Sequence, residues 1–563
     1  MPKEVYTKSQ KSIEAYLNEL DFSRVDPVKS GQLTMRGKIV TEGKEFDTVV
    51  ALYDDIPASH PKFYSVDCDM VFFEPHIERP EYVKNFGTLT GMCIKPEDEM
   101  VYYQNPVELI HNSFNDYERL CSDLTLGVFD SKADLFDEFD SYWPNNYTVY
   151  KYMKEALVDK KMVSLIILDP VVQNNSIQSQ QLILTDSVSD IENYAKAAGY
   201  KISKVICPYI DLGKTFGLPL PYTYGDILNK ITKTGHLKYL KKLQGQSVSN
   251  FLFLGFDLPD GIKHYVAVYV EDIIDSGHDK KKSRFQLFFK AKAKKKPFSG
   301  AHVKSISREW LMERGGDSNV SALSNQSLKI AIIGCGSIGS NLAYKLCKSG
   351  LSNMILIDPD TLKSDNIGRH FLGMQDVGKK KSLAMAETLN SQFIGMKVEA
   401  YTGKAQHFIN EVSNVDLIIT AIGSDAPAVE PHFAELVKQK ELPPMLSCWL
   451  EADAIAGHSF FVDKEMSASF EEMTNKMELL DSDFASRLVK SENGCNSNYM
   501  PYSHLSADEH INKMAHFIID IIMGKRSSRG LSSFGKVERF LEHLQYPVKE
   551  DSVMYWQEES YDV

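Results

Sequence analysis

Residues 330–340, "IAIIGCGSIGS", carry the pattern that best indicates the fold of the C-terminal part of this chain. An apolar run breaks into three glycines, Gly334, Gly336 and Gly339, at the spacing G-x-G-x-x-G. A strand that feeds such a turn and then a helix, here expected over 341–348, brings backbone N–H groups close to phosphate oxygens. The pattern therefore predicts a nucleotide site. Nicotinamide and flavin enzymes use the same turn, and a strand–helix junction that binds nothing also fits it, so the residues downstream have to decide.

The surrounding sequence predicts an α/β multidomain protein. Strands near 329, 353, 416 and 445 alternate with helices, which indicates a Rossmann-like domain over residues 305–563. Residues 149–304 alternate strand patterns, among them "RFQLFF" at 284–289, with helical patterns around 190 and 230, and are expected to form a mixed α/β linker domain. Residues 1–148 are expected to form a separate α+β domain.

The residues between 358 and 425 indicate which nucleotide is bound. Asp358 lies 19 residues after Gly339, a position suited to a ribose hydroxyl. A dehydrogenase needs apolar space for nicotinamide near the turn, whereas a triphosphate needs cations and a carboxylate for magnesium. Arg369, Lys381 and Asp425 meet the second requirement. The sequence therefore favours ATP with Mg²⁺.

These motifs resemble the adenylation domain of ubiquitin-activating enzymes and their ThiF/MoeB relatives over roughly residues 305 to 530. The motifs that carry the resemblance are the glycine turn, Asp358-x-Asp360, Asp365-Asn366-x-x-Arg369, Gly378-x-x-Lys381 and Ser424-Asp425.

The resemblance implies a role for each residue of these motifs. The glycine turn with Asp358 and Asp360 would hold ATP, while Asn366, Arg369 and Lys381 would contact its phosphates. Asp425 would bind Mg²⁺. In the family an arginine that reaches across a homodimer completes the site.

The candidates for the arginine that crosses the dimer are Arg314 and Arg308.

Some positions depart from the family pattern. Asp365 stands where the family has serine, and His370 follows Arg369 where the family has glutamine. The chain has eight cysteines but no C-x-x-C pair, so the paired zinc motifs of ThiF and MoeB are missing. This weakens a sulfur-carrier role but not adenylation.

An acyl adenylate can be captured by a thiol, so a cysteine is expected downstream. Cys495, in the polar segment "NGCNSNYMPYS" before a helix marked by Ser506 and Glu509, is the predicted first acceptor, and the nearby His504 could assist it. Cys448 lies inside the apolar run "MLSCWL" and is expected to be a packed structural thiol.

The N-terminal block contains a second candidate thiol, Cys93, in "GTLTGMCIKPED". A helix and three strand-like runs precede Cys93, and a helix with Asn105 as its N-cap and Pro106 in its first turn follows it. This order resembles a ubiquitin-conjugating enzyme over about 10–145, with Cys93 at the place of the acceptor cysteine. The His-Pro-Asn tripeptide of eukaryotic members is absent. Cys68 and Cys121 are expected to be core thiols.

A conjugating-like domain before an activating-like domain resembles the CD-NTase-associated conjugating proteins of bacterial CBASS antiphage operons. The resemblance implies a relay from an adenylate to Cys495, then to Cys93 and finally to a target amine. The substrate would be the C-terminus of a cGAS-like nucleotidyltransferase. Two alternatives stay open: a sulfur-carrier adenylyltransferase with a non-catalytic N-terminal half, and an ATP-gated scaffold.

The charge and hydropathy of the chain exclude some partners. Lys and Arg number 63 against 76 Asp and Glu, a net charge of −13, which argues against broad binding to nucleic acid or to an anionic membrane. No 18-residue apolar span and no signal-peptide pattern is present, so the protein is expected to be cytoplasmic.

Overall fold

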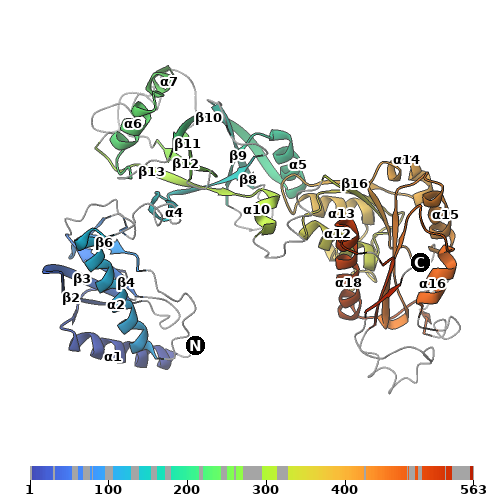
Figure 1. Cartoon of the computed structure of the whole chain (residues 1–563), viewed down its shortest axis with the longest axis horizontal. Helices are drawn as coiled ribbons and strands as arrows, with labels where there is room; N and C mark the ends of the chain where they lie inside the picture. Colours follow the sequence, from blue (N-terminus) through green and yellow to red (C-terminus); the bar gives the residue numbers. More distant parts are fainter. Residues whose placement is uncertain are drawn as a thin grey trace. The chain divides into compact units, whose positions relative to one another are not determined.

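Figure 1 shows the computed structural model of the chain, which forms two compact units. One unit comprises Met1–Val149, Ala156–Val163 and Val205–Val303, and the other comprises Tyr150–Glu155, Ser164–Lys204 and Lys304–Val563. The predicted division into 1–148, 149–304 and 305–563 stays a prediction. The residues that the structure describes are 3–29, 32–52, 61–67, 77–78, 80–94, 105–128, 139–153, 157, 162–170, 179–214, 220–242, 250–258, 262–270, 295–313, 327–423, 426–478, 480, 488–491, 498–526, 528–534 and 558–561.

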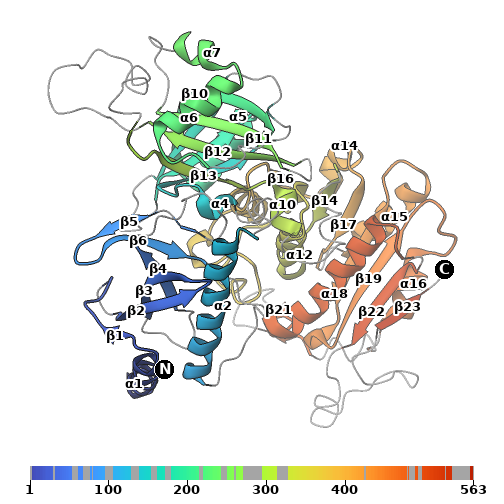
Figure 2. The same ribbon diagram turned by 60° about the vertical axis from the view of Figure 1, so that its left-hand side comes forward.

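The N-terminal part of the first unit is a six-stranded sheet with two helices (Figure 2). The strand order is β1-β2-β3-β4-β6-β5, with antiparallel pairing throughout. The strands are β1 (Ser23–Arg24), β2 (Leu33–Thr41), β3 (Lys44–Leu52), β4 (Lys62–Val66), β5 (Glu81–Val83) and β6 (Gly87–Met92). Helices α1 (Lys3–Glu19) and α2 (Pro106–Leu126) pack with the sheet around one apolar cluster.

The start of α2 confirms the predicted cap. Asn105 accepts a hydrogen bond from the Val107 backbone N–H, and Pro106 occupies the first turn, where its missing N–H costs nothing. Cys121 lies fully buried on the apolar side of this helix, as predicted. Cys68 lies outside the described residues.

The remainder of the first unit contains β11 (Phe251–Asp257), β12 (Lys263–Tyr269) and most of β10 (Tyr200–Lys214) and β13 (Ser299–Ser305). Strand β11 pairs in parallel with β10, and β12 pairs antiparallel with both β11 and β13. Helix α6 (Tyr224–Lys233) has a capping box of Thr223 and Asp226 and buries Ile227 and Ile231 against these strands. Two short helices, α4 (Phe139–Tyr142) and α7 (Leu237–Lys242), belong to the same cluster.

The second unit contains β9 (Gln181–Thr185), most of β8 (Met162–Pro170) and half of β7 (Tyr147–Tyr152). Strand β9 pairs in parallel with β7 and antiparallel with β8, and α5 (Val188–Ala198) packs against this part. The two helices predicted around 190 and 230 are thereby confirmed as α5 and α6. The predicted strand "RFQLFF" lies outside the described residues.

The C-terminal sheet of the second unit has the order β16-β15-β14-β17-β18-β19-β22-β23. The first five strands are parallel and the rest are antiparallel. The strands are β14 (Lys329–Ile333), β15 (Asn353–Ile357), β16 (Lys397–Tyr401), β17 (Leu417–Thr420), β18 (Met445–Leu450), β19 (Ala456–Val462), β22 (Gly530–Phe534) and β23 (Glu558–Tyr561).

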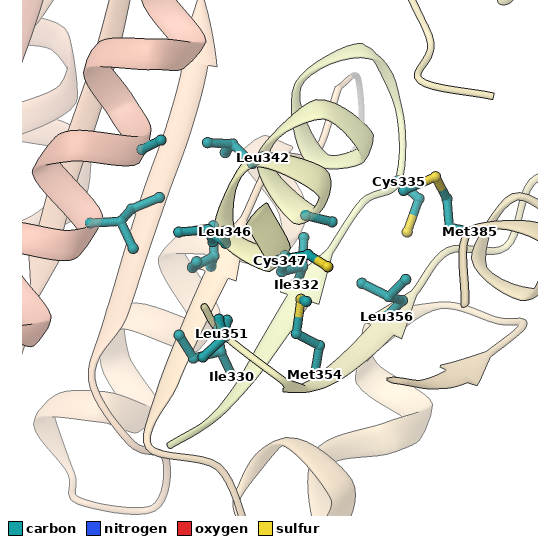
Figure 3. Close-up of a cluster of buried hydrophobic side chains, with 14 of the residues drawn as sticks. Ile330, Ile332, Cys335, Leu342, Leu346, Cys347, Leu351, Met354, Leu356 and Met385 are labelled. Atoms are coloured by element: carbon teal, nitrogen blue, oxygen red, sulfur yellow. The ribbon is translucent and has the colours of Figure 1, made fainter. Parts of the chain in front are cut away.

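Helices cover both faces of this sheet (Figure 1). On one face, α12 (Ser337–Lys348), α13 (Lys381–Asn390) and α18 (His504–Ile522) pack on the side of β14 that carries Ile330 and Ile332. On the other, α14 (Ile409–Val412), α15 (Ala426–Lys438) and α16 (Phe470–Met477) pack on the side that carries Ala331 and Ile333. This alternation buries β14 on both faces, as expected for a central parallel strand. Figure 3 shows part of the apolar cluster around Ile330 and Ile332.

The structure corrects several predicted boundaries. The helix after the glycine turn begins at Ser337 rather than at Asn341. Helix α18 begins at His504, because Ser503 is its N-cap and accepts a hydrogen bond from the Ser506 N–H. Strands β16, β19, β22 and β23 were not predicted. No helix in the described part of the chain is long and apolar enough to cross a membrane.

Candidate nucleotide site

The glycine turn between β14 and α12 is fixed by close backbone packing. Gly334 has a φ of +92°, and a Cβ atom there would overlap the Ala421 carbonyl oxygen. A Cβ atom at Gly339 would overlap the carbonyl oxygen of Gly334. At Gly336, by contrast, nothing lies within 4 Å of the Cβ position. The first and third glycines are therefore required by the fold, whereas the second leaves open space in front of the helix N-terminus.

Asp358 follows β15 and connects it to the glycine turn. Its carboxylate accepts hydrogen bonds from the Cys335 N–H (2.6 Å) and the Asp360 N–H (2.7 Å). Burial raises the pKa of Asp358, and the two backbone donors act in the opposite direction. The carboxylate thus holds the turn and the end of β15 in one arrangement.

His370 holds the same turn from the other side. Its Nδ1 accepts a hydrogen bond from the Leu372 N–H (3.0 Å), which places the ring proton on Nε2, and Nε2 donates to the Cys335 carbonyl (2.6 Å). Burial lowers the pKa of His370, so the ring is neutral at pH 7. At the position where this chain departs from the family pattern, the side chain therefore supports the turn.

Lys381 supplies a buried cation at the start of α13. Its ammonium group lies 2.9 Å from the Asp360 carboxylate, which is 64% exposed, whereas the Lys381 side chain is 10% exposed. The Lys381 N–H also donates to the Asp360 carbonyl at 3.0 Å. The two residues are thus joined by an ion pair and a backbone hydrogen bond at the end of β15, and the buried ammonium group faces an exposed carboxylate.

Asp358, Asp360, Lys381 and the first two glycines of the turn line a cavity of about 390 Å³. Strand β14 lies between β15 and β17, where the order of the parallel strands reverses, and open α/β sheets bind ligands at such a point. The volume falls within the range of small-molecule sites. The lining residues are Ile333, Gly334, Gly336, Ile357, Asp358, Pro359, Asp360, Lys381, Gly403, Lys404, Ala405, Gln406, Ala421, Ile422, Gly423 and Val429.

The structure brings together five of the predicted site residues in this cavity: Gly334, Gly336, Asp358, Asp360 and Lys381. Sequence reasoning missed the segment Gly403–Gln406 after β16. The signal that could have found it is the pair Gly403-Lys404, a glycine and a cation at the end of a parallel strand.

Asn366 and Arg369 lie in a loop that does not line the cavity. The Asn366 side chain accepts a hydrogen bond from the Lys363 N–H at 3.1 Å, and the Asn366 carbonyl accepts from the N–H groups of Arg369 and His370. The Arg369 carbonyl in turn accepts from the Asn341 side chain at 3.0 Å, which attaches the loop to α12. The phosphate contacts of Asn366 and Arg369 stay predictions.

Three predicted site residues, Asp425, Arg314 and Cys495, lie outside the described residues, and their roles also stay predictions. Arg308 lies at the start of α10 (Arg308–Glu313). Among the described residues, no group of three or more His, Cys, Asp or Glu side chains could hold a metal ion. Asp358 and Asp360, the carboxylates of the cavity, are engaged by backbone N–H groups and by Lys381.

The described candidate thiols differ sharply. Cys93 is exposed and directly follows β6. Cys448 is buried within β18, and burial raises its pKa to about 12. The prediction that Cys448 is a packed structural thiol agrees with this burial.

Comparison with known proteins identifies the domain that carries the cavity. Residues 306–478 match the ThiF family. The ThiF region therefore includes the glycine turn, Asp358, Lys381 and the whole parallel part of the sheet. The predicted ThiF-type domain at the C-terminal side of an α/β multidomain chain is thereby confirmed.

The chain is also similar to curated bacterial proteins named ATP-dependent ubiquitin transferase-like protein Cap2. The one from Pseudomonas aeruginosa (strain BWHPSA011 / Pa011) is 33% identical over 146 residues, which cover 25% of this chain and 26% of that protein. The one from Escherichia coli (strain TW11681) is 24% identical over 414 residues, which cover 66% of this chain and 68% of that protein. The predicted resemblance to a bacterial ThiF-type fusion protein is confirmed by these matches.

The chain is also similar to a eukaryotic activating enzyme. The NEDD8-activating enzyme E1 catalytic subunit of Caenorhabditis elegans is 35% identical over 103 residues, which cover 17% of this chain and 24% of that protein. Among solved structures, that of E. coli MccB with ATP has a TM-score of 0.31 and 15% identity, covering 43% of this chain and 65% of that chain.

Proposed function

We propose that this protein uses ATP to activate the C-terminal carboxylate of another protein and then transfers the acyl group through two of its own cysteines. The observation that carries the proposal is the cavity in the ThiF region, where the glycine turn, Asp358 and Lys381 converge. The names of the curated relatives, an ATP-dependent ubiquitin transferase-like protein and an activating enzyme, support it.

Each residue of the site has a role in this proposal. The turn formed by Gly334, Gly336 and Gly339 holds the phosphates with backbone N–H groups, and Asp358 orients the ribose end of ATP. Lys381 and Asp360 lie where the triphosphate leaves the turn, and Lys381 gains a stronger anionic partner there than the exposed carboxylate of Asp360.

Asn366, Arg369, Arg314 and Asp425 complete the proposed site. Asn366 and Arg369 contact the phosphates, and Arg314 of one protomer reaches the site of its partner in a homodimer. Asp425, the residue before Ala426 in the sequence, is the one that would hold Mg²⁺. The metal supplies charge neutralisation at the phosphates when bound.

The chemistry of activation follows from the acyl group. A carboxylate oxygen of the substrate attacks the α-phosphorus of ATP, the bond to the β-phosphate breaks and pyrophosphate leaves. The thiolate of Cys495 then attacks the acyl carbonyl, and AMP leaves with the electron pair of the broken bond. The product is a thioester on Cys495.

The N-terminal domain receives this acyl group in the proposal. The thiolate of Cys93 attacks the thioester and releases the thiolate of Cys495; a target amine then attacks the new thioester, loses its proton and releases Cys93. The exposure of Cys93 after β6, between an antiparallel sheet and the capped helix α2, supports a ubiquitin-conjugating-like fold for residues 1–148. On this view residues 149–304 are the linker domain.

The substrate and setting come from the resemblance to CBASS-associated proteins. We infer that the activated terminus belongs to a cGAS-like nucleotidyltransferase in antiviral defence, that the acceptor is an amine on another protein, and that the enzyme works as a cytoplasmic homodimer without nucleic acid or membrane. The similarity to Cap2 proteins supports this setting.

The experiment is ATP–pyrophosphate exchange with a purified cGAS-like nucleotidyltransferase from the same genome. Exchange should require the intact C-terminus of that protein, so a version without its last residues is the matched control. Asp425→Asn should reduce exchange by about 100-fold or more because the metal ligand is lost. Exchange that proceeds equally with the truncated protein would contradict activation of a protein terminus.

A further inference from the structure

The Arg369 side chain makes contacts that its predicted phosphate role does not explain. Its guanidinium Nη1 donates a hydrogen bond to the Met500 carbonyl at 2.8 Å, across 131 positions of the sequence. Its Cζ atom lies 4.6 Å from the centre of the Tyr502 ring. Arg369 therefore joins the loop beside the nucleotide cavity to the segment that leads into α18.

Among the residues that the structure describes, these contacts leave the positive charge of Arg369 without an anionic partner. A carbonyl and an aromatic face are neutral, and in the described part of the chain Arg369 makes no ion pair with a carboxylate. Lys381 differs, because Asp360 lies 2.9 Å from its ammonium group. A guanidinium that is held only by neutral groups binds phosphate oxygens when they come within reach, since a charge-assisted bidentate contact is stronger than either neutral contact.

The backbone around Arg369 can stay in place while its side chain moves. The Arg369 carbonyl accepts from Asn341, and an ion pair of 2.9 Å between Lys345 and Asp508 joins α12 to α18. Both contacts are independent of the guanidinium. The segment 498–502 differs, since Arg369 binds it directly at Met500 and Tyr502.

We propose that nucleotide phosphates and the segment 498–502 compete for Arg369, with Tyr502 as the positioning residue that holds the guanidinium when no nucleotide is bound. This inference rests on the proposed function, which assigns Arg369 to the phosphates of ATP. Because Arg369 does not line the cavity in the present arrangement, it has to leave Met500 and Tyr502 to reach a phosphate. Nucleotide binding then releases the segment that directly follows the Cys495 region, and the coupling is reciprocal.

The first test measures the affinity for a non-hydrolysable ATP analogue with Mg²⁺. Tyr502→Leu removes the aromatic ring that holds Arg369 when no nucleotide is bound. Because the loss of this cation–π contact destabilises only the nucleotide-free state, the analogue should bind about three- to tenfold more tightly. Tyr502→Phe keeps the face and should keep wild-type affinity. Tyr82→Leu, the same change at a tyrosine that is 78% exposed in the N-terminal sheet, should also leave the affinity unchanged.

The second test uses the wild-type chain and needs no variant to fold. Saturation with the analogue should speed hydrogen exchange at the amides of residues 498–500, 502 and 503 by about three- to tenfold, the factor expected for the affinity change in Tyr502→Leu. Unchanged or slower exchange, or equal analogue affinity in wild type and Tyr502→Leu, would overturn the inference while the proposed function stands. If the wild type does not bind the analogue at all, the proposed function fails and the inference fails with it.

Discussion

The nucleotide cavity is held together by backbone groups, whereas Cys93 stands exposed at the end of a strand. Around the cavity, Gly334 packs against the Ala421 carbonyl and Asp358 accepts hydrogen bonds from two backbone N–H groups. At Cys93, the preceding Met92 is buried and the thiol itself is accessible. A change that disturbs the packed turn at Gly334 should therefore act through the fold, whereas a change at the exposed Cys93 should act through the chemistry of transfer.

The strongest test of this difference is a pair of glycine variants. Gly334→Ala should destabilise the ThiF region by about 2–4 kcal/mol and abolish binding of an ATP analogue, because alanine is strained at a φ of +92° and its Cβ would overlap the Ala421 carbonyl. Gly336→Ala is the matched control, since its Cβ meets nothing within 4 Å. It should fold normally and weaken only nucleotide binding. Thermal unfolding and equilibrium binding measure both effects.

An equal loss of stability in Gly334→Ala and Gly336→Ala would contradict the view that packing fixes the first glycine and ligand approach fixes the second.

The next test removes the exposed thiol. Cys93→Ala should unfold like the wild type, form a reducible thioester on Cys495 and make no stable amide product, because only the second acceptor is lost. Cys93→Lys should trap the acyl group as an amide on the chain itself. Non-reducing and reducing gels of reactions with ATP and the substrate protein distinguish these species.

The control for the thioester step is a pair of cysteine variants. Cys495→Ala should form the adenylate but no thioester, whereas Cys448→Ala should keep the thioester, because Cys448 is buried and its pKa of about 12 leaves almost no thiolate near pH 8. Full conjugation by Cys93→Ala would show that the N-terminal domain takes no part in transfer.

A third test changes a side chain of the cavity without changing its backbone. Lys381→Ala should reduce substrate-dependent ATP–pyrophosphate exchange by about 100- to 1000-fold, since a cation next to the phosphates is lost. Stability should change little, because Asp360 is 64% exposed and can be hydrated. Lys379→Ala, which removes a half-exposed ammonium group that pairs with the buried Asp376, is the control and should keep near-normal exchange. A similar loss of exchange in Lys381→Ala and Lys379→Ala would show that positive charge in this region, rather than the Lys381 ammonium group itself, supports the reaction.

The parts of the site that could be predicted are those encoded locally. The run from 330 to 340 contains a buried strand, a glycine turn and a helix start within a few residues, and Asp358 and Lys381 follow at the ends of elements with clear apolar patterns. The ThiF match confirms the domain that these motifs predicted.

The parts that could not be predicted depend on edge position or on distant contacts. Strand β16 lies at the edge of its sheet and is only partly buried, so its sequence "KVEAY" has little apolar pattern, and Lys404 behind it was missed. The start of α18 was placed near Ser506 because a serine cap there has the same chemistry as Ser503, and only the observed hydrogen bond distinguishes them. The Arg369 contact with Met500 joins residues 131 positions apart.

The smallest expected effect concerns a buried carboxylate behind the cavity. Glu430, on α15, accepts hydrogen bonds from the Thr420 hydroxyl (2.5 Å) at the end of β17 and from the Ser447 hydroxyl (2.9 Å) within β18. Burial raises its pKa above the ordinary value of 4.5, and the two hydroxyl donors oppose this shift. The folded state therefore binds the proton more tightly than the unfolded state. The stability that the protonated Glu430 contributes is fully present below about pH 4.5. It is lost as the pH rises through the raised pKa of Glu430 in the folded state.

Glu430→Gln tests this pH dependence because glutamine keeps an oxygen that accepts both hydroxyl bonds but cannot ionise. The variant should gain stability relative to the wild type as the pH rises from 5 to 8, and the gain should shrink toward pH 5. Thermal unfolding across this range measures it, with Glu435→Gln, on the exposed side of the same helix, as the control. A constant difference between wild type and Glu430→Gln at every pH would mean that Glu430 does not change its charge over this range. The cavity would then have an ionised carboxylate behind its wall, and side-chain charge as well as backbone packing would determine the stability of the nucleotide site.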